Sequence, residues 1–162
     1  MKVKMILIIS LTLISGGIFY LFNITAPEPG MSSGNGNPAI LFLFILIPIG
    51  IILIFLWNYL LKIISPYKRV LFSILLVIVG YWVYGVYHYL SFQENYREAI
   101  KAAYLEKSQP VDEEFITDLS SSFLSMSSNV VYFNLNTFIL FMLSIIFLSI
   151  IFYLVNINTD EK

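Results

Sequence analysis

Four stretches of the sequence contain no Asp, Glu, Lys or Arg and are long enough to cross a lipid bilayer. They cover about residues 5–23, 39–61, 70–90 and 131–155. The hydrocarbon core of a bilayer is about 30 Å thick, and a helix of about 20 apolar residues spans it with its backbone hydrogen bonds satisfied internally. We therefore predict an all-α membrane protein, a four-transmembrane-helix bundle that forms a single integral membrane domain over residues 1–162.

The composition excludes several classes of protein. Hydrophobic residues make up 59% of the chain and charged residues 12%, which is too little charge to cover the surface of a soluble domain. The net charge of −1 gives no reason to expect a nucleic-acid partner. There is no cysteine and only one histidine, so disulfides and thiolate metal sites are excluded. We expect neither a metal nor another cofactor.

The first stretch has two interpretations. Lys2 and Lys4 precede it, which is typical both of a membrane helix and of a secretory signal peptide. The apolar run is long and no small-x-small cleavage site closes it. We therefore interpret residues 1–23 as a retained helix, with a cleaved signal peptide as the alternative. Gly16 and Gly17 would let a neighbouring helix approach closely.

The second stretch contains a proline near its middle. Pro48 has no amide hydrogen to donate to the carbonyl of Phe44, so the sequence predicts a kink. The functional hypothesis is a hinge at Pro48. The alternative is an ordinary kink, because proline is tolerated in membrane helices.

The third stretch changes character along its length, from aliphatic residues to tyrosines. Tyr81, Tyr84 and His88 share one face at helical spacing. One hypothesis is a polar-aromatic stripe that lines a cavity, with His88 as a proton-sensitive group. The alternative is a packed core in which the tyrosine hydroxyls bond to neighbouring carbonyls and His88 lies among the lipid headgroups.

The segment between the third and fourth stretches is the only long polar one. Its pattern predicts amphipathic helices at about 91–108 and 111–125, and the first could continue the third span out of the membrane. Residues 91–130 hold three cations and seven anions, a net charge of −4. The apolar face of the first helix could cover the bundle, lie on the membrane or bind a partner. We interpret it as the candidate partner-binding face, which consists of Phe92, Tyr96, Ile100 and Tyr104.

The distribution of cations predicts the orientation. One side of the predicted bundle is flanked by Lys2, Lys4, Lys62, Lys68 and Arg69, whereas the short loop of residues 24–38 has no cation. The three cations of residues 91–130 are fewer and are surrounded by acids. By the positive-inside rule, both termini and the loop of residues 62–69 face the cytoplasm, and residues 91–130 are extracytoplasmic. We expect a multi-pass protein of the cell (plasma) membrane with lipid around it.

The chemistry that catalysis would need is absent from the sequence. The spans hold no ionisable carboxylate or amine, and the chain has no phosphate-binding loop or nucleophile–base motif. We therefore expect a non-enzymatic protein that acts by binding a membrane or extracytoplasmic partner, in an accessory, assembly or immunity-type role.

Two alternatives stay open. The first is an oligomeric, holin-like pore, in which copies of the chain would share polar residues around a lumen: Tyr81, Tyr84, Asn134, Asn136, Thr137. The second is a carrier or binder of an apolar small molecule, held between Pro48 and the stripe of Tyr81, Tyr84 and His88. The expected partner is accordingly a protein, a second copy of the chain or a small molecule.

Overall fold

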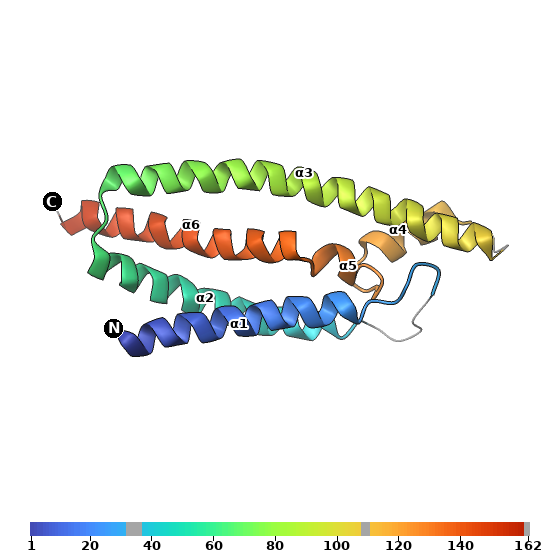
Figure 1. Ribbon diagram of the computed structural model, residues 1–162, viewed down its shortest axis with the longest axis horizontal. Coiled ribbons are helices and arrows are strands. Elements are labelled where there is room, and N and C mark those ends of the chain that lie inside the picture. The colour runs from blue at the N-terminus through green and yellow to red at the C-terminus, as the bar shows by residue number, and fades with distance from the viewer. Residues whose placement is uncertain (32–36, 108–110, 161–162) are drawn as a thin grey trace.

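The computed structural model describes residues 1–31, 37–107 and 111–160, and all regular structure in these ranges is helical. Figure 1 shows the helices in chain order: α1 (Lys2–Ile24), α2 (Ala39–Ile64), α3 (Lys68–Glu106), α4 (Glu113–Ser121), α5 (Asn129–Tyr132) and α6 (Leu135–Asp160). Four of them, α1, α2, α3 and α6, are long and apolar enough to cross a membrane. The predicted all-α bundle with four spans is therefore confirmed, and these helices indicate a multi-pass membrane protein.

Helix α6 lies at the centre of the bundle. It packs against α1, α2 and α3, and in Figure 1 it runs between α2 and α3. Helix α1 packs on α2, whereas α3 packs on α6 and then, further along, on α4 and α5. The N-terminus, the α2–α3 connection and the end of α6 lie at one end of the bundle (Figure 1). We call the opposite end, which carries α4 and α5, the α4–α5 end.

Close packing and hydrogen bonds join α6 to α2. Ser149 is fully buried, and its hydroxyl donates to the carbonyl of Ile54 at 3.1 Å. The side-chain amide of Asn58 donates in return to the carbonyl of Ser149 at 3.3 Å. Gly50 is buried where the ring of Phe141 approaches it. Lipid is as apolar as a leucine side chain, so membrane helices associate through contacts of this kind rather than through a hydrophobic driving force.

The third span and the polar segment after it form one continuous helix. Helix α3 has 39 residues, a length of about 58 Å at about 1.5 Å per residue, so it extends far beyond a core about 30 Å thick. The helix predicted at 91–108 is therefore the second half of α3, as expected if it continues the third span. Helix α4 is shorter than the predicted 111–125. Asp112 caps its start by accepting a hydrogen bond from the amide of Glu114 at 3.0 Å.

The fourth span begins later than predicted, because the chain breaks between α5 and α6. The side-chain oxygen of Asn134 accepts from the amide of Thr137, and the Thr137 hydroxyl accepts from the amide of Asn134, both at 3.0 Å. This reciprocal pair is a capping box, which starts a new helix at Leu135. The side-chain amide of Asn134 also donates to the carbonyl of Val131 at 2.8 Å. The predicted span 131–155 is thus corrected to α6, preceded by one short turn of helix.

Two buried asparagines hold the α4–α5 end together. The side-chain amide of Asn37 donates to the Asn129 oxygen at 2.7 Å, and the Asn129 amide donates back to the Asn37 oxygen at 3.2 Å. Asn37 also donates to the carbonyls of Phe123 and Ser125, and its oxygen accepts from the amide of Ala39. We call this pair the amide clamp. It ties the start of α2 to the first residue of α5, and the further bonds of Asn37 tie it to the segment between α4 and α5.

Candidate functional site

Helices α3 and α6 are in close contact at Gly85. The side-chain amide of Asn136 donates to the Gly85 carbonyl at 2.9 Å, and the Tyr81 hydroxyl donates to the Asn136 oxygen at 3.3 Å. A Cβ atom on Gly85 would lie 2.7 Å from a methyl group of Leu140, so any larger residue at this position would force the Leu140 side chain to move. The contact fixes the position of the tyrosines that follow one face of α3.

A groove lies beside this contact and opens to the surroundings. It has a volume of about 340 Å³, at the lower end of the range for small-molecule sites. We call it the α3–α6 groove; its walls come from both helices: Tyr81, Tyr84, His88, Phe92, Asn134, Leu135, Asn136, Ile139. The structure thus brings the three residues of the predicted stripe to one surface, where they line an open groove rather than an enclosed cavity.

The aromatic rings of this stripe follow one another along α3. The centroids of Tyr81 and Tyr84 are 5.8 Å apart, and those of Tyr84 and His88 are 6.0 Å apart. The His88 ring is stacked on Phe92. Such a row of rings gives the groove an apolar wall with polar atoms at intervals.

Two polar groups of the groove have no hydrogen-bond partner among the described residues. Tyr84 is 57% exposed and its hydroxyl is unbonded, and the imidazole of His88 makes ring contacts alone. The Tyr81 hydroxyl, by contrast, is bonded to Asn136. In a hydrocarbon environment an unbonded polar group is costly, because no water can satisfy it. The groove therefore offers hydrogen bonds to a molecule with both apolar and polar parts.

The sequence predicts the α6 side of the groove only in part. Asn134 and Asn136 are predicted as polar residues of an oligomeric pore, and the continuing hydropathy places them inside the fourth span rather than at a helix start. The spacing of Asn134 and Thr137 is the signal that could have located the helix start, since a capping box places two such side chains three residues apart.

The predicted partner-binding face of α3 is covered by the chain itself, so that assignment requires correction. Tyr96 and Tyr104 are each 8% exposed and Ile100 is 1% exposed. They pack against Ile116 of α4 and Val131 of α5, both fully buried. The physical reason is that α4 is also amphipathic, and the two apolar faces exclude water by meeting each other. Phe92 alone of the four reaches the α3–α6 groove.

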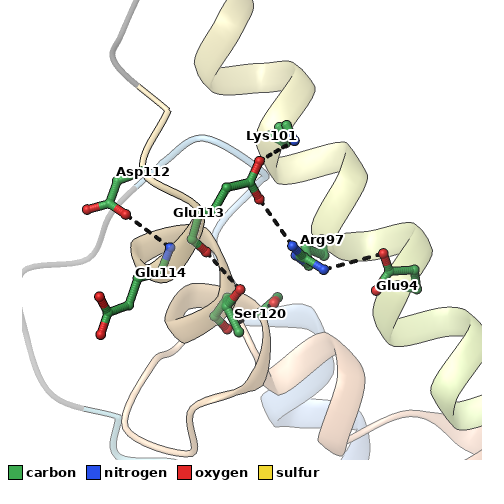
Figure 2. Close-up of polar contacts among 8 residues, drawn as sticks. Glu94, Arg97, Lys101, Asp112, Glu113, Glu114 and Ser120 are labelled. Carbon is green, nitrogen blue, oxygen red and sulfur yellow. Dashed lines mark hydrogen bonds and ion pairs between the residues drawn. The ribbon is translucent and has the colours of Figure 1, made fainter.

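Ion pairs hold α4 on α3. Figure 2 shows Glu113 of α4 between two cations of α3: its carboxylate is bonded to Lys101 and lies 3.1 Å from Arg97. Arg97 also contacts Glu94 at 3.5 Å. Hydrogen bonds from Lys101 and then Arg97 lower the pKa of Glu113, and the hydrogen bond to Glu113 raises the pKa of Lys101. These charges lie beside the apolar contact between α3 and α4 and, being partly exposed, add modestly to it.

Docking of α4 should weaken in acid. A carboxyl group whose pKa is lowered when docked stabilises the docked state above its ordinary pKa of about 4.3, and this stabilisation is lost as the pH falls through the docked pKa. Amide-exchange protection of α4, corrected for intrinsic exchange rates, should fall a few-fold between about pH 6 and pH 3. In Glu113→Gln, which keeps every other acid, most of this change should disappear. An equal acid response in both proteins would contradict the assignment.

Pro48 lies apart from the stripe. The α-helix continues through it from Ala39 to Ile64, and its side chain is exposed. Helix α2 packs on α1 and α6, so the structure does not bring Pro48 and the stripe of Tyr81, Tyr84 and His88 together. A small molecule held between the two, as predicted, is therefore not supported. The hinge at Pro48 stays a prediction.

The described residues contain no group of three or more His, Asp or Glu side chains that could hold a metal ion. Comparison of the chain with protein-family models, with curated proteins and with solved structures finds no match. The functional argument therefore depends on the geometry of the α3–α6 groove.

Proposed function

We propose that this chain is a non-enzymatic, multi-pass protein of the cell membrane that acts by binding an amphiphilic molecule in the α3–α6 groove. The observation that carries the proposal is a groove of small-molecule size, open to its surroundings, with an apolar wall and the unbonded Tyr84 hydroxyl. Because an amphiphilic molecule partitions into the bilayer, such a ligand would enter the open groove from the lipid rather than from water.

The cations of the chain support a location in the outer leaflet. Five of them lie near the ends of α1, α2 and α3 that are remote from the α4–α5 end: Lys2, Lys4, Lys62, Lys68, Arg69. The positive-inside rule places this end and both termini in the cytoplasm. Tyr84 follows Arg69 by 15 residues and His88 by 19, about 22 and 28 Å of helix. In a core about 30 Å thick, Tyr84 is then in the outer half and His88 at the outer boundary.

These depths match the chemistry of an amphiphile. Ester, hydroxyl and phosphate oxygens lie near the boundary of the hydrocarbon core, where they can accept hydrogen bonds from His88 and Tyr84. The acyl part of the ligand would follow the rings towards Tyr81 and Ile139. Binding of this kind uses van der Waals contact and a few hydrogen bonds, because lipid and groove are equally apolar.

Replacing Tyr84 with phenylalanine tests the proposal. The change removes one exposed hydroxyl and keeps the ring, so the fold should be unaffected. We expect retention of phosphatidylglycerol probes, measured by native mass spectrometry of the detergent-purified protein, to fall about five- to tenfold, the effect of one lost hydrogen bond. The probes are the dioleoyl lipid and its single-chain lyso derivative. Reduced retention of either probe by the Tyr84→Phe variant supports the proposed site.

Tyr87→Phe is the matched control, because Tyr87 is 72% exposed on the same helix and does not line the groove. It should retain the probes as the unmodified protein does. If the protein retains neither probe, or if the Tyr84 and Tyr87 variants behave alike, the proposed site is wrong.

A protein partner is the second candidate. Beyond the covered face of α3, the segment from α4 through α5 exposes three large apolar side chains: Phe115 at 43%, Phe123 at 50% and Leu124 at 73%. Exposed apolar groups on a surface outside the membrane are typical of protein contacts. A protein that co-purifies from native membranes and is unaffected by Tyr84→Phe would favour this accessory or assembly role.

The pore hypothesis draws less support from the geometry. A shared lumen would need polar groups that are free to face water, but the hydroxyl of Thr137 donates to the carbonyl of Tyr132 at 2.7 Å. Asn134 is used in the capping box and Asn136 in the contact with Gly85. These groups join one part of the chain to another, which leaves little to line a channel.

A further inference from the structure

A second groove lies on the other side of the start of α6. Its volume is about 200 Å³. We call it the α1–α6 groove; its walls come from α1, from the break between α5 and α6, and from the start of α6: Gly16, Phe19, Tyr20, Asn23, Phe133, Asn134, Leu135, Phe138. It shares Asn134 and Leu135 with the α3–α6 groove. Leu135 is 72% exposed, so it forms a ridge with one groove on each side.

Both grooves exist because of particular residues. The capping box of Asn134 and Thr137 starts α6 at Leu135 and leaves this residue between α1 and α3. On the α1 side, Gly16 keeps the floor of the groove open, since a Cβ atom there would already lie 3.4 Å from the ring of Phe138. Any larger side chain at Gly16 would extend into the space that the groove now occupies.

The polar groups of the two grooves lie at the same end. Helices α1 and α3 both run towards the α4–α5 end (Figure 1). The α1–α6 groove therefore begins at Gly16 and ends at Asn23, and the α3–α6 groove begins at Tyr81 and ends near His88. Among the described residues, the side-chain amide of Asn23 has no hydrogen-bond partner, as is also true of the Tyr84 hydroxyl. Each groove is thus apolar towards the bilayer centre and polar towards its surface.

We infer that the ligand is a lipid with two acyl chains, one in each groove, that straddles Leu135 with its headgroup between Asn23 and His88. The inference rests on the proposed function and adds the class of ligand. Two largely apolar grooves that share Asn134 and Leu135 as one wall, with polar groups at one common end, complement two tails joined to one head.

The test compares two probes that differ in chain number alone. The detergent-purified full chain is mixed with equal amounts of dioleoylphosphatidylglycerol and its single-chain lyso derivative, and retention is measured by native mass spectrometry. We expect the two-chain lipid to be retained about tenfold better, since small differences in groove filling change affinity by this factor or more. Gly16→Leu should fill the α1–α6 groove and bring retention of the two-chain lipid down to that of the lyso lipid, whose own retention should not change.

Gly17→Leu is the matched control, because nothing lies within 4 Å of a Cβ atom at Gly17 and the residue lines neither groove. It should retain both probes normally. If Gly16→Leu does not fold, Gly16→Ala replaces it in the test, since its added atom meets Phe138 at an ordinary contact distance. We then expect a smaller fall in the ratio of two-chain to single-chain lipid retained. Equal retention of the two probes by the unmodified protein would overturn the two-chain inference and leave the proposed function standing. Retention of neither would overturn both.

Discussion

Replacing Gly85 with leucine is expected to separate α3 from α6 and to lower the free energy of unfolding by about 3 kcal/mol. The new side chain would overlap Leu140, whose methyl group would lie 2.7 Å from the Cβ position, and would approach the Asn136 oxygen. The hydrogen bond from Asn136 to the Gly85 carbonyl would be lost with the close approach. Overpacking and the lost bond act in the same direction, because both depend on the same helix separation.

Thermal unfolding in detergent measures this effect, and Gly80→Leu is its control. Gly80 lies on the same helix, and nothing is within 4 Å of a Cβ atom there. Both changes raise helix propensity equally, so the difference between the two variants isolates the packing term. A midpoint lowered by about 6–12 °C for Gly85→Leu alone is the expected result. The same midpoint for both variants would show that α3 does not depend on close contact with α6.

Replacing Asn129 with leucine is expected to open the amide clamp. Asn129 is fully buried, and it both donates to and accepts from Asn37. Leucine has a similar volume but makes neither hydrogen bond, and it leaves the polar side chain of Asn37 facing an apolar group. Two lost hydrogen bonds at a buried site cost about 2–3 kcal/mol.

The effect should be local to the α4–α5 end, since the spans have contacts of their own. Amide exchange in α5 and at the start of α2 should speed up about thirtyfold, which corresponds to about 2 kcal/mol of local opening. Asn95→Leu is the control, because Asn95 is exposed on α3 and no bond of the clamp involves it. Unchanged exchange in the Asn129 variant would mean that other contacts hold this end.

The sequence predicted the spans well because hydropathy is summed residue by residue. Residues 39–61 and 70–90 lie within α2 and α3, and no knowledge of neighbours was needed to find them. The prediction failed at Asn134, where the chain remains apolar on average while two side chains start a new helix. A hydropathy average does not detect a hydrogen-bonding motif.

The sequence predicts only the α3 wall of the candidate site. Tyr81, Tyr84 and His88 were identified by their spacing on one helix face, because helical periodicity alone places them together. Their opposite wall on α6 could not be found in this way. The face of Tyr96, Ile100 and Tyr104 was correctly recognised as apolar, but an apolar stripe has the same pattern whether a partner or another segment of its own chain covers it.

The amino-acid sequence by itself thus determined the number of spans, the amphipathic character of the segment after the third span, and the row of tyrosines on α3. Each follows from the solvation of single residues and from helical periodicity, which are local properties. Only the tertiary structure decided that α3 packs on α6, that α4 covers α3, and that Leu135 stands between two grooves. These choices depend on close packing at glycines and on hydrogen bonds between residues as far apart as 51 and 92 positions. Transfer of an apolar side chain from lipid to a helix interface changes its solvation free energy very little, so hydropathy does not determine which helices pack together.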